Sequence, residues 1–222
     1  MSETTRERYR ATIVAVAPAV MVAAFAAHPY IGLGPPNAGA VAAAAAANTT
    51  LWAVSHLAVA VGSGLLALAF LAIRSYLREA GEERWSALGL PLLVMGSTLY
   101  AVLPGMEFAA LAAAETGADV RAAQSAVEPW FIPMILASAV AFTIGAISFA
   151  KAVRSIGLSS RGLTRVVVGG LVALAVARLI PLTGVQFYLQ SAALLVALWP
   201  LAYEMRRHPE PSVASPVAVR AA

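Results

Sequence analysis

The sequence predicts an all-helical bundle of six transmembrane helices. Composition is the first reason: 60% of the 222 residues are hydrophobic, only 12% are charged, and the mean hydropathy is +0.80. A soluble domain carries roughly 45–50% apolar and about 25% charged residues. The second reason is that the apolar residues fall into six long stretches. Together these observations exclude a soluble enzyme, a disordered chain and a nucleic-acid-binding domain.

Each of the six stretches is continuously apolar and is separated from the next by charged or loop-forming residues. A helix that crosses a bilayer needs about 20 apolar residues, and only helices satisfy their own backbone in lipid with this pattern. The alternation expected of a membrane barrel strand is missing. The expected spans 1 to 6 are residues 11–28 (or 31), 50–73, 86–106 (or 114), 130–150, 166–180 and 185–203.

Basic residues indicate how these spans are oriented. All but two of the 15 lysines and arginines lie before span 1, between spans 2 and 3, between spans 4 and 5, or after span 6. The exceptions are Arg121, in a loop on the opposite side, and Arg178, within span 5. Because cytoplasmic loops retain Lys and Arg, we expect a plasma-membrane protein with both termini in the cytoplasm.

The chain is expected to form one transmembrane domain, residues 1–208, followed by a disordered cytoplasmic tail, residues 209–222. The tail is rich in Pro, Ser, Val and Ala, and chain ends of this kind are seldom ordered. The N-terminal arginines, apolar run and small residues at 24–27 also fit a cleavable signal peptide. We favour an uncleaved first span, because apolar residues continue beyond that site.

The two middle pairs of spans resemble each other. Each pair begins near a tryptophan, Trp52 or Trp130, and ends near a proline, Pro104 or Pro181. A duplicated two-helix hairpin (spans 2–3 and 4–5) is one interpretation, and similar composition alone is the other. Short helices are expected in both outer loops, in the alanine run at 42–47 and at 119–127. Tryptophans such as Trp52 are expected to anchor the bundle at the membrane interface.

Small residues spaced four apart predict the faces on which the spans pack. Such residues let helix backbones approach closely in lipid, where no hydrophobic drive holds helices together. The expected pairs and series are Ala60 and Gly64 on span 2, Ala141 and Gly145 on span 4, and Gly169, Ala173 and Ala177 on span 5.

Polar side chains within the spans or at their ends form the candidate site, because ionisable residues in a membrane are costly and usually functional. In the expected topology all of them lie in the outer half of the bundle, which predicts an outward-opening polar pocket. Gln190 is a weaker candidate. The candidate catalytic residues are Glu107, Tyr100 and Arg178, and the candidate ligand-binding residues are His28, His56 and Gln186.

Glu107 is the expected acid if the protein is an enzyme, because an apolar setting favours the protonated carboxyl group. Tyr100 lies seven residues earlier, on the same helical face if the helix continues through Pro104. Arg178 and Gln186 would orient the substrate or stabilise charge. The alternative for Glu107 and Arg178, the only opposite charges at this depth, is a structural salt bridge between spans 3 and 5.

The two histidines suggest haem b as a possible cofactor. His28 and His56 could ligate it through two imidazoles, although Pro29 takes His28 out of helical geometry and His56 lies roughly 5 Å deeper. A hydrolytic metal would need Glu107 as third ligand, and no spacing motif such as HExxH is present, so no metal ligands are predicted. The absence of cysteine excludes disulfides and thiolate sites.

Three hypotheses for function follow. The first is a membrane protein that binds a lipophilic small molecule in the outer pocket and, if it is an enzyme, transforms it by acid catalysis without a metal. The second is a haem-bearing electron-transfer protein. The third is a transporter or accessory subunit, against which the sparse polar residues of the inner half count. The expected partners are membrane lipids and the lipophilic molecule, and not nucleic acid.

Overall fold

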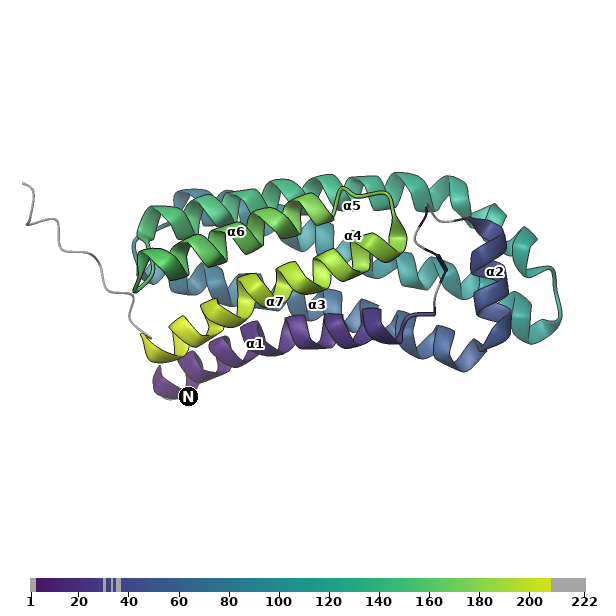
Figure 1. Cartoon of the computed structure of the whole chain (residues 1–222), viewed down its shortest axis with the longest axis horizontal. Coiled ribbons are helices and arrows are strands. Elements are labelled where there is room, and N and C mark those ends of the chain that lie inside the picture. The colour runs from purple at the N-terminus through teal and green to yellow at the C-terminus, as the bar shows by residue number, and fades with distance from the viewer. Residues whose placement is uncertain (1–2, 30, 33, 35–36, 209–222) are drawn as a thin grey trace, which may run out of the picture.

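The computed structural model describes residues 3–29, 31–32, 34 and 37–208, so the predicted tail, residues 209–222, lies outside the described residues. The described residues form seven α-helices and no strand (Figure 1). The all-helical prediction is therefore confirmed. The helices are α1 (Glu3–Ala27), α2 (Ala38–Ala47), α3 (Thr49–Glu79), α4 (Arg84–Thr116), α5 (Val120–Ile156), α6 (Arg161–Ala177) and α7 (Thr183–Arg207).

Five of these helices, α1, α3, α4, α5 and α7, are long and apolar enough to cross a membrane. The chain is therefore a multi-pass membrane protein. The helix α6, with 17 residues, is about 26 Å long, which is shorter than the roughly 30 Å hydrocarbon core. The predicted count of six spans is thus not confirmed by helix length.

The predicted hairpin duplication is not confirmed either. In a duplicated pair α6 would correspond to α4, yet α6 has 17 residues and α4 has 33. The difference arises at the two matched prolines. Pro104 lies inside α4, which continues for three more turns, whereas Pro181 lies in the turn after α6. A proline removes one helical hydrogen bond, and in α4 the chain tolerates that loss.

The six helices other than α2 form a closed ring in chain order. From α3 to α7 each of these helices packs against the next, α1 packs against α3, and α7 returns to pack against α1. Successive helices run in opposite directions along the long axis of the molecule (Figure 1). Where the ring closes, Trp199 Nε1 donates a hydrogen bond of 3.0 Å to the carbonyl oxygen of Ala15.

Close helix contacts at glycines hold this ring together. A Cβ atom added to Gly96 of α4 would lie 2.7 Å from the backbone nitrogen of Phe142 on α5. A Cβ atom on Gly170 of α6 would lie equally close to the backbone nitrogen of Ala197 on α7. Only glycine permits these approaches. Small residues therefore bring the helix backbones together, as expected in lipid.

The predicted packing face is right on α5, whereas on α3 and α6 the predicted glycine faces outward, although Ala177 of α6 is buried as predicted. Ala141 and Gly145 of α5 are buried, as predicted, and Gly145 packs against α4. By contrast, Gly64 of α3 and Gly169 of α6 are exposed, and a Cβ atom on either would meet nothing within 4 Å. On α6 the packed glycine is the neighbouring Gly170, and on α3 it is Gly62.

One end of the ring is covered by α2, which the alanine run forms as predicted. α2 lies across the ends of the long helices (Figure 1) and contacts α3, α4 and α5. The side chains of Asn37 and Asn48 cap α2 and α3, respectively, by accepting backbone hydrogen bonds. The second predicted loop helix, residues 119–127, does not form a separate element. Instead, Asp119 caps α5, which begins at Val120 and continues through the prolines at 129 and 133.

The opposite end of the ring carries charged contacts. Arg10 of α1 forms a 2.7 Å ion pair with Glu79 at the end of α3. The buried carboxylate of Glu204 on α7 accepts hydrogen bonds of 2.7 Å from both the backbone N–H and the hydroxyl group of Ser159. These contacts fix α1 to α3 and the α5–α6 turn to α7, far from the end covered by α2.

Candidate functional site

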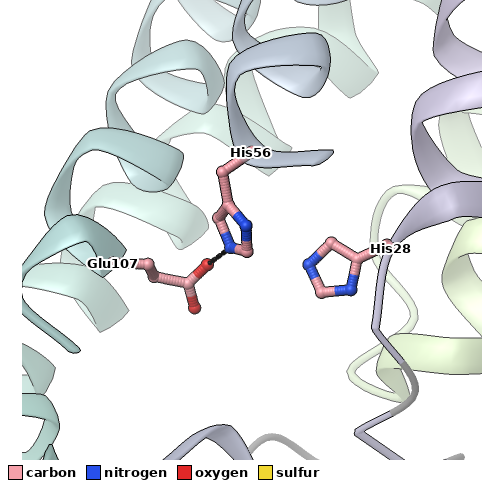
Figure 2. Close-up of side chains that lie close together, drawn as sticks. All are labelled: His28, His56 and Glu107. Atoms are coloured by element: carbon pink, nitrogen blue, oxygen red, sulfur yellow. Dashed lines mark hydrogen bonds and ion pairs between the residues drawn. The ribbon is translucent and has the colours of Figure 1, made fainter. Parts of the chain in front are cut away.

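Three titratable side chains meet near the end of the bundle that α2 covers. His28 directly follows α1, His56 lies two turns into α3, and Glu107 lies on α4 (Figure 2). A ligand atom from each of them lies within 4.8 Å of the others. His56 Nε2 is 2.6 Å from Glu107 Oε2, and the ring centroids of His28 and His56 are 4.8 Å apart. We call these three residues the His–His–Glu cluster.

Backbone carbonyl groups orient both imidazole rings of the cluster. His56 Nδ1 lies 2.6 Å from the carbonyl oxygen of Trp52, and His28 Nδ1 lies 2.9 Å from that of Pro29. A carbonyl oxygen only accepts hydrogen bonds, so each Nδ1 carries a proton. In the neutral ring, Nε2 then has a free lone pair. Figure 2 shows the second nitrogen of each ring directed toward the centre of the cluster.

Trp52 belongs to this site, although the sequence predicted a membrane anchor. Its side chain is fully buried, and its ring lies 4.2 Å from that of His56 and 5.8 Å from that of His28. The indole Nε1 donates a 3.2 Å hydrogen bond to the carbonyl oxygen of Glu107. The four-residue spacing of Trp52 and His56, which places both on one helical face, was the available sequence signal.

A second polar centre surrounds Arg178, which caps the end of α6 and is only 5% exposed. Its Nη1 donates a 2.7 Å hydrogen bond to Gln190 Oε1, and its Nη2 donates one of 3.4 Å to Ser138 Oγ. The guanidinium carbon lies 3.5 Å from the ring centroid of Tyr100, a cation–π distance. Two further residues thus contact Arg178 directly. Gln190 was a weaker candidate from the sequence, and Ser138 was not a candidate.

The salt bridge considered between Glu107 and Arg178 does not form. Glu107 is paired with His56, and across the described residues no carboxylate lies within 4.0 Å of the Arg178 guanidinium. Glu107 lies about two turns, roughly 10 Å, beyond Tyr100 along α4, and Tyr100 is the residue that contacts Arg178. Gln186 contacts the backbone of Arg178 rather than its side chain. Its Nε2 donates a 3.0 Å hydrogen bond to the Arg178 carbonyl oxygen.

A cavity of about 410 Å³ connects the two polar centres. Apolar side chains make up most of its wall. Gln124 also lines it, is 8% exposed, and has no hydrogen-bond partner for its Oε1 within the described structure. All six site residues predicted from the sequence lie in the wall of this cavity: His28, His56, Tyr100, Glu107, Arg178 and Gln186.

The two centres lie at different distances from the charged end of the bundle. At 1.5 Å per residue, His56 is roughly 35 Å along α3 from its end at Glu79, and Arg178 is roughly 26 Å along α6 from Arg161. The hydrocarbon core is about 30 Å thick. The His–His–Glu cluster therefore lies farther from the charged end of the bundle than Arg178 does.

The cluster does not fit haem ligated by both histidines. A porphyrin would have to lie between the two imidazole rings, but these are in contact at 4.8 Å between centroids. Glu107 Oε2 also lies at the His56 nitrogen that iron would need. Two imidazoles and a carboxylate are, however, a common ligand set for a single divalent metal. No metal ligands were predicted, because residues 28, 56 and 107 form no spacing motif.

Comparisons with known proteins give no assignment for this site. No protein-family model, no curated protein and no solved structure matches the chain. The function therefore has to be inferred from the geometry and chemistry of the described residues.

Proposed function

We propose that this membrane protein binds a lipophilic small molecule that carries an anionic group. The observation that carries the proposal is the cavity of about 410 Å³, which has mostly apolar walls and the buried guanidinium of Arg178 within them. Small-molecule sites are typically mostly apolar cavities of about 300–1,000 Å³ with a few convergent polar groups. Size and lining thus both support a small-molecule site.

The charge of Arg178 supports an anionic ligand. A buried cation is costly when no opposite charge compensates it, and in membrane spans such residues commonly mark ligand or ion pathways. Arg178 is held by Gln190, Ser138 and Tyr100, all of which are neutral partners. A ligand carboxylate or phosphate in the cavity would supply the missing charge and could accept two parallel guanidinium hydrogen bonds.

The position of the cavity supports entry from the bilayer. Part of its wall is formed by large apolar side chains that are also exposed on the outside of the bundle. In a membrane these side chains contact lipid, so the ligand needs to displace only side chains rather than cross a polar surface. They are Ile132, Leu136 and Val140 of α5 and Leu179 after α6, with exposures of 47%, 60%, 53% and 53%.

We further propose six crossings of the plasma membrane, with both termini in the cytoplasm. The chain leaves α5 at the end of the bundle opposite α2 (Figure 1) and begins α7 at Thr183, which lines the cavity. Only α6 and the turn that follows it connect the end of α5 with the start of α7. α6 packs against both of these helices. The basic residues gathered at the charged end support the cytoplasmic assignment of that end.

The predicted metal-free acid catalysis by Glu107 has weaker support than binding does. Its carboxylate lies 2.6 Å from His56 Nε2, so a proton at this position would be shared with a basic imidazole. Transport also has weaker support, because the cavity lies at one end of the bundle. The buried Glu204 at the other end is already bound to the α5–α6 turn. Binding is therefore the function that the geometry supports best.

Binding can be tested with purified protein in detergent and a fluorescent fatty acid, with its methyl ester as the uncharged control. The fatty acid should bind wild-type protein at least tenfold more tightly than the ester does. Arg178→Gln should abolish this preference, and Arg121→Gln, at an exposed residue in the first turn of α5, should preserve it. Leu136→Trp, at the lipid-facing wall, should weaken binding of both probes. Equal affinity for acid and ester in wild-type protein would refute the proposal.

A further inference from the structure

We propose that the His–His–Glu cluster binds a divalent transition-metal ion of the zinc class, with one coordination position left open toward the cavity. The inference goes beyond ligand binding, because it concerns the cluster and does not depend on Arg178. His28, His56 and Glu107 all line the cavity, so a metal bound to them would face whatever occupies it.

The contact between His56 and Glu107 is the first observation that supports a metal. His56 Nδ1 is committed as a donor to the Trp52 carbonyl oxygen, so Nε2 of the neutral ring is an acceptor. Glu107 Oε2, only 2.6 Å away, is also an acceptor when it is ionised. Two acceptors at this distance repel each other unless a cation lies between them. That cation is either a proton or a metal ion.

His28 is what favours the metal over the proton. A proton shared between His56 and Glu107 would need only those two residues, yet a third ligand atom, from His28, lies within 4.8 Å of both. The ring of His28 is held by its hydrogen bond to Pro29, with its other nitrogen directed into the cluster (Figure 2). A tetrahedral site with bonds of about 2.0–2.1 Å places ligand atoms roughly 3.3 Å apart. Changes of up to about 1.5 Å in the distances between ligand atoms would therefore complete the site.

The ligand types indicate which metals fit. Two imidazole nitrogens and one carboxylate oxygen are the protein ligands of many catalytic zinc sites, whose fourth position holds water or substrate. The same set with open positions also binds ferrous iron. Structural zinc sites instead use four protein ligands, commonly cysteine, and this chain has none. The cluster thus matches an open site for a zinc-class metal.

The groups that form hydrogen bonds to the ligand residues also match those found at metal centres. Histidines that bind metals usually donate their other N–H to a carbonyl or carboxylate group, which fixes the ring orientation. Both histidines do so here, to Trp52 and Pro29. The backbone of Glu107 is held as well, by the Trp52 indole. Two of these contacts involve Trp52, so a single buried residue links both ligands on α3 and α4.

The test uses the full-length protein in detergent with an affinity tag that contains no histidine. After chelator treatment, Co²⁺ is titrated in, because tetrahedral Co²⁺ absorbs visibly, and Zn²⁺ is then added to displace it. We expect one Co²⁺ per chain. His28→Asn and Glu107→Gln should each lower affinity by about 100-fold or more, since loss of a group that only hydrogen-bonds to a metal ligand already costs about 10–100-fold.

Matched controls separate the cluster from other histidines and carboxylates. His208→Asn, at the exposed end of α7, and Glu128→Gln, exposed near the cavity, should leave Co²⁺ binding unchanged. If His56→Asn does not fold, the test relies on His28→Asn. His28 lies outside the helices, so its substitution should leave the fold intact. Absence of stoichiometric Co²⁺ binding in folded wild-type protein, or unchanged binding in His28→Asn and Glu107→Gln, would overturn the inference.

Failure of the metal site can be distinguished from failure of the proposed function. Fatty-acid binding is measured on the same chelator-treated protein before Co²⁺ is added. Retained fatty-acid binding without stoichiometric Co²⁺ binding would overturn the metal site alone. Stoichiometric Co²⁺ binding without a preference for the acid over its ester would support the metal site and overturn only the proposed ligand class.

Discussion

Gly170 of α6 sets the distance between the two helices that hold Arg178 and its partner Gln190. A Cβ atom at Gly170 would lie 2.7 Å from the backbone nitrogen of Ala197 and 2.9 Å from its Cα atom. Ordinary contact begins at 3.4 Å, so Gly170→Ala requires α6 and α7 to separate by about 0.7 Å at this point. Because the obstacle is backbone, no side-chain rotation removes it.

We expect Gly170→Ala to destabilise the protein by about 1–3 kcal/mol, the usual cost of overpacking. Arg178 and Gln190 lie on the separated helices, and their hydrogen bond of 2.7 Å would lengthen toward the limit for such bonds, about 3.2 Å or more. The affinity for the fatty acid should therefore fall together with stability. The adjacent Gly169 faces open space, so Gly169→Ala should be neutral or slightly stabilising.

The assay is thermal unfolding in detergent followed by circular dichroism, with fatty-acid affinity measured on the same samples. The two variants add the same methyl group to neighbouring residues of one helix, so differences between them report packing alone. Gly170→Ala with the melting temperature and affinity of Gly169→Ala would refute the packing described for α6 and α7.

Two further predictions concern the other end of the bundle and its orientation. Glu204→Gln replaces one acceptor oxygen opposite Ser159 with an amide N–H, so it should lower the free energy of unfolding by about 1–3 kcal/mol. The control variant Glu83→Gln, at an exposed residue, should leave the melting temperature unchanged. The chain has no cysteine, so an introduced cysteine is the single site of reaction with a maleimide. Ala118→Cys should react with a membrane-impermeant maleimide in intact cells, and Glu83→Cys should react only after permeabilisation. The reverse pattern would contradict the proposed orientation.

Helix class and helix positions could be predicted from the sequence because they depend on local composition. Apolar length and flanking charge suffice to locate a crossing helix, and Asn48 is a cap that can be recognised locally. The orientation of each helix about its own axis could not be predicted in the same way. Leucines that face lipid and leucines that face the core are chemically alike, so the pattern does not distinguish Gly169 from Gly170 or identify Trp52 as buried.

The candidate site could be predicted as a set of residues but not as a geometry. Intramembrane polar residues are rare, so rarity alone points to Glu107 and Arg178. Their partners depend on how α3, α4, α6 and α7 are rotated and staggered. The pairing of Glu107 with His56, 51 residues earlier, and of Arg178 with Gln190 is a property of the assembled ring, and no spacing rule in a single sequence expresses it.

Closure of the ring between α1 and α7 has a consequence for synthesis of the protein. α7 leaves the ribosome after the other described helices, yet it supplies the Trp199 contact to α1 and the Gln190 contact to Arg178. During translation, α6 and Arg178 are therefore made before the amide partner of the Arg178 guanidinium. Chains that end before α7 would lack both the hydrogen bond to Arg178 and the contact that closes the ring. The ring can thus close only after α7 has been completed.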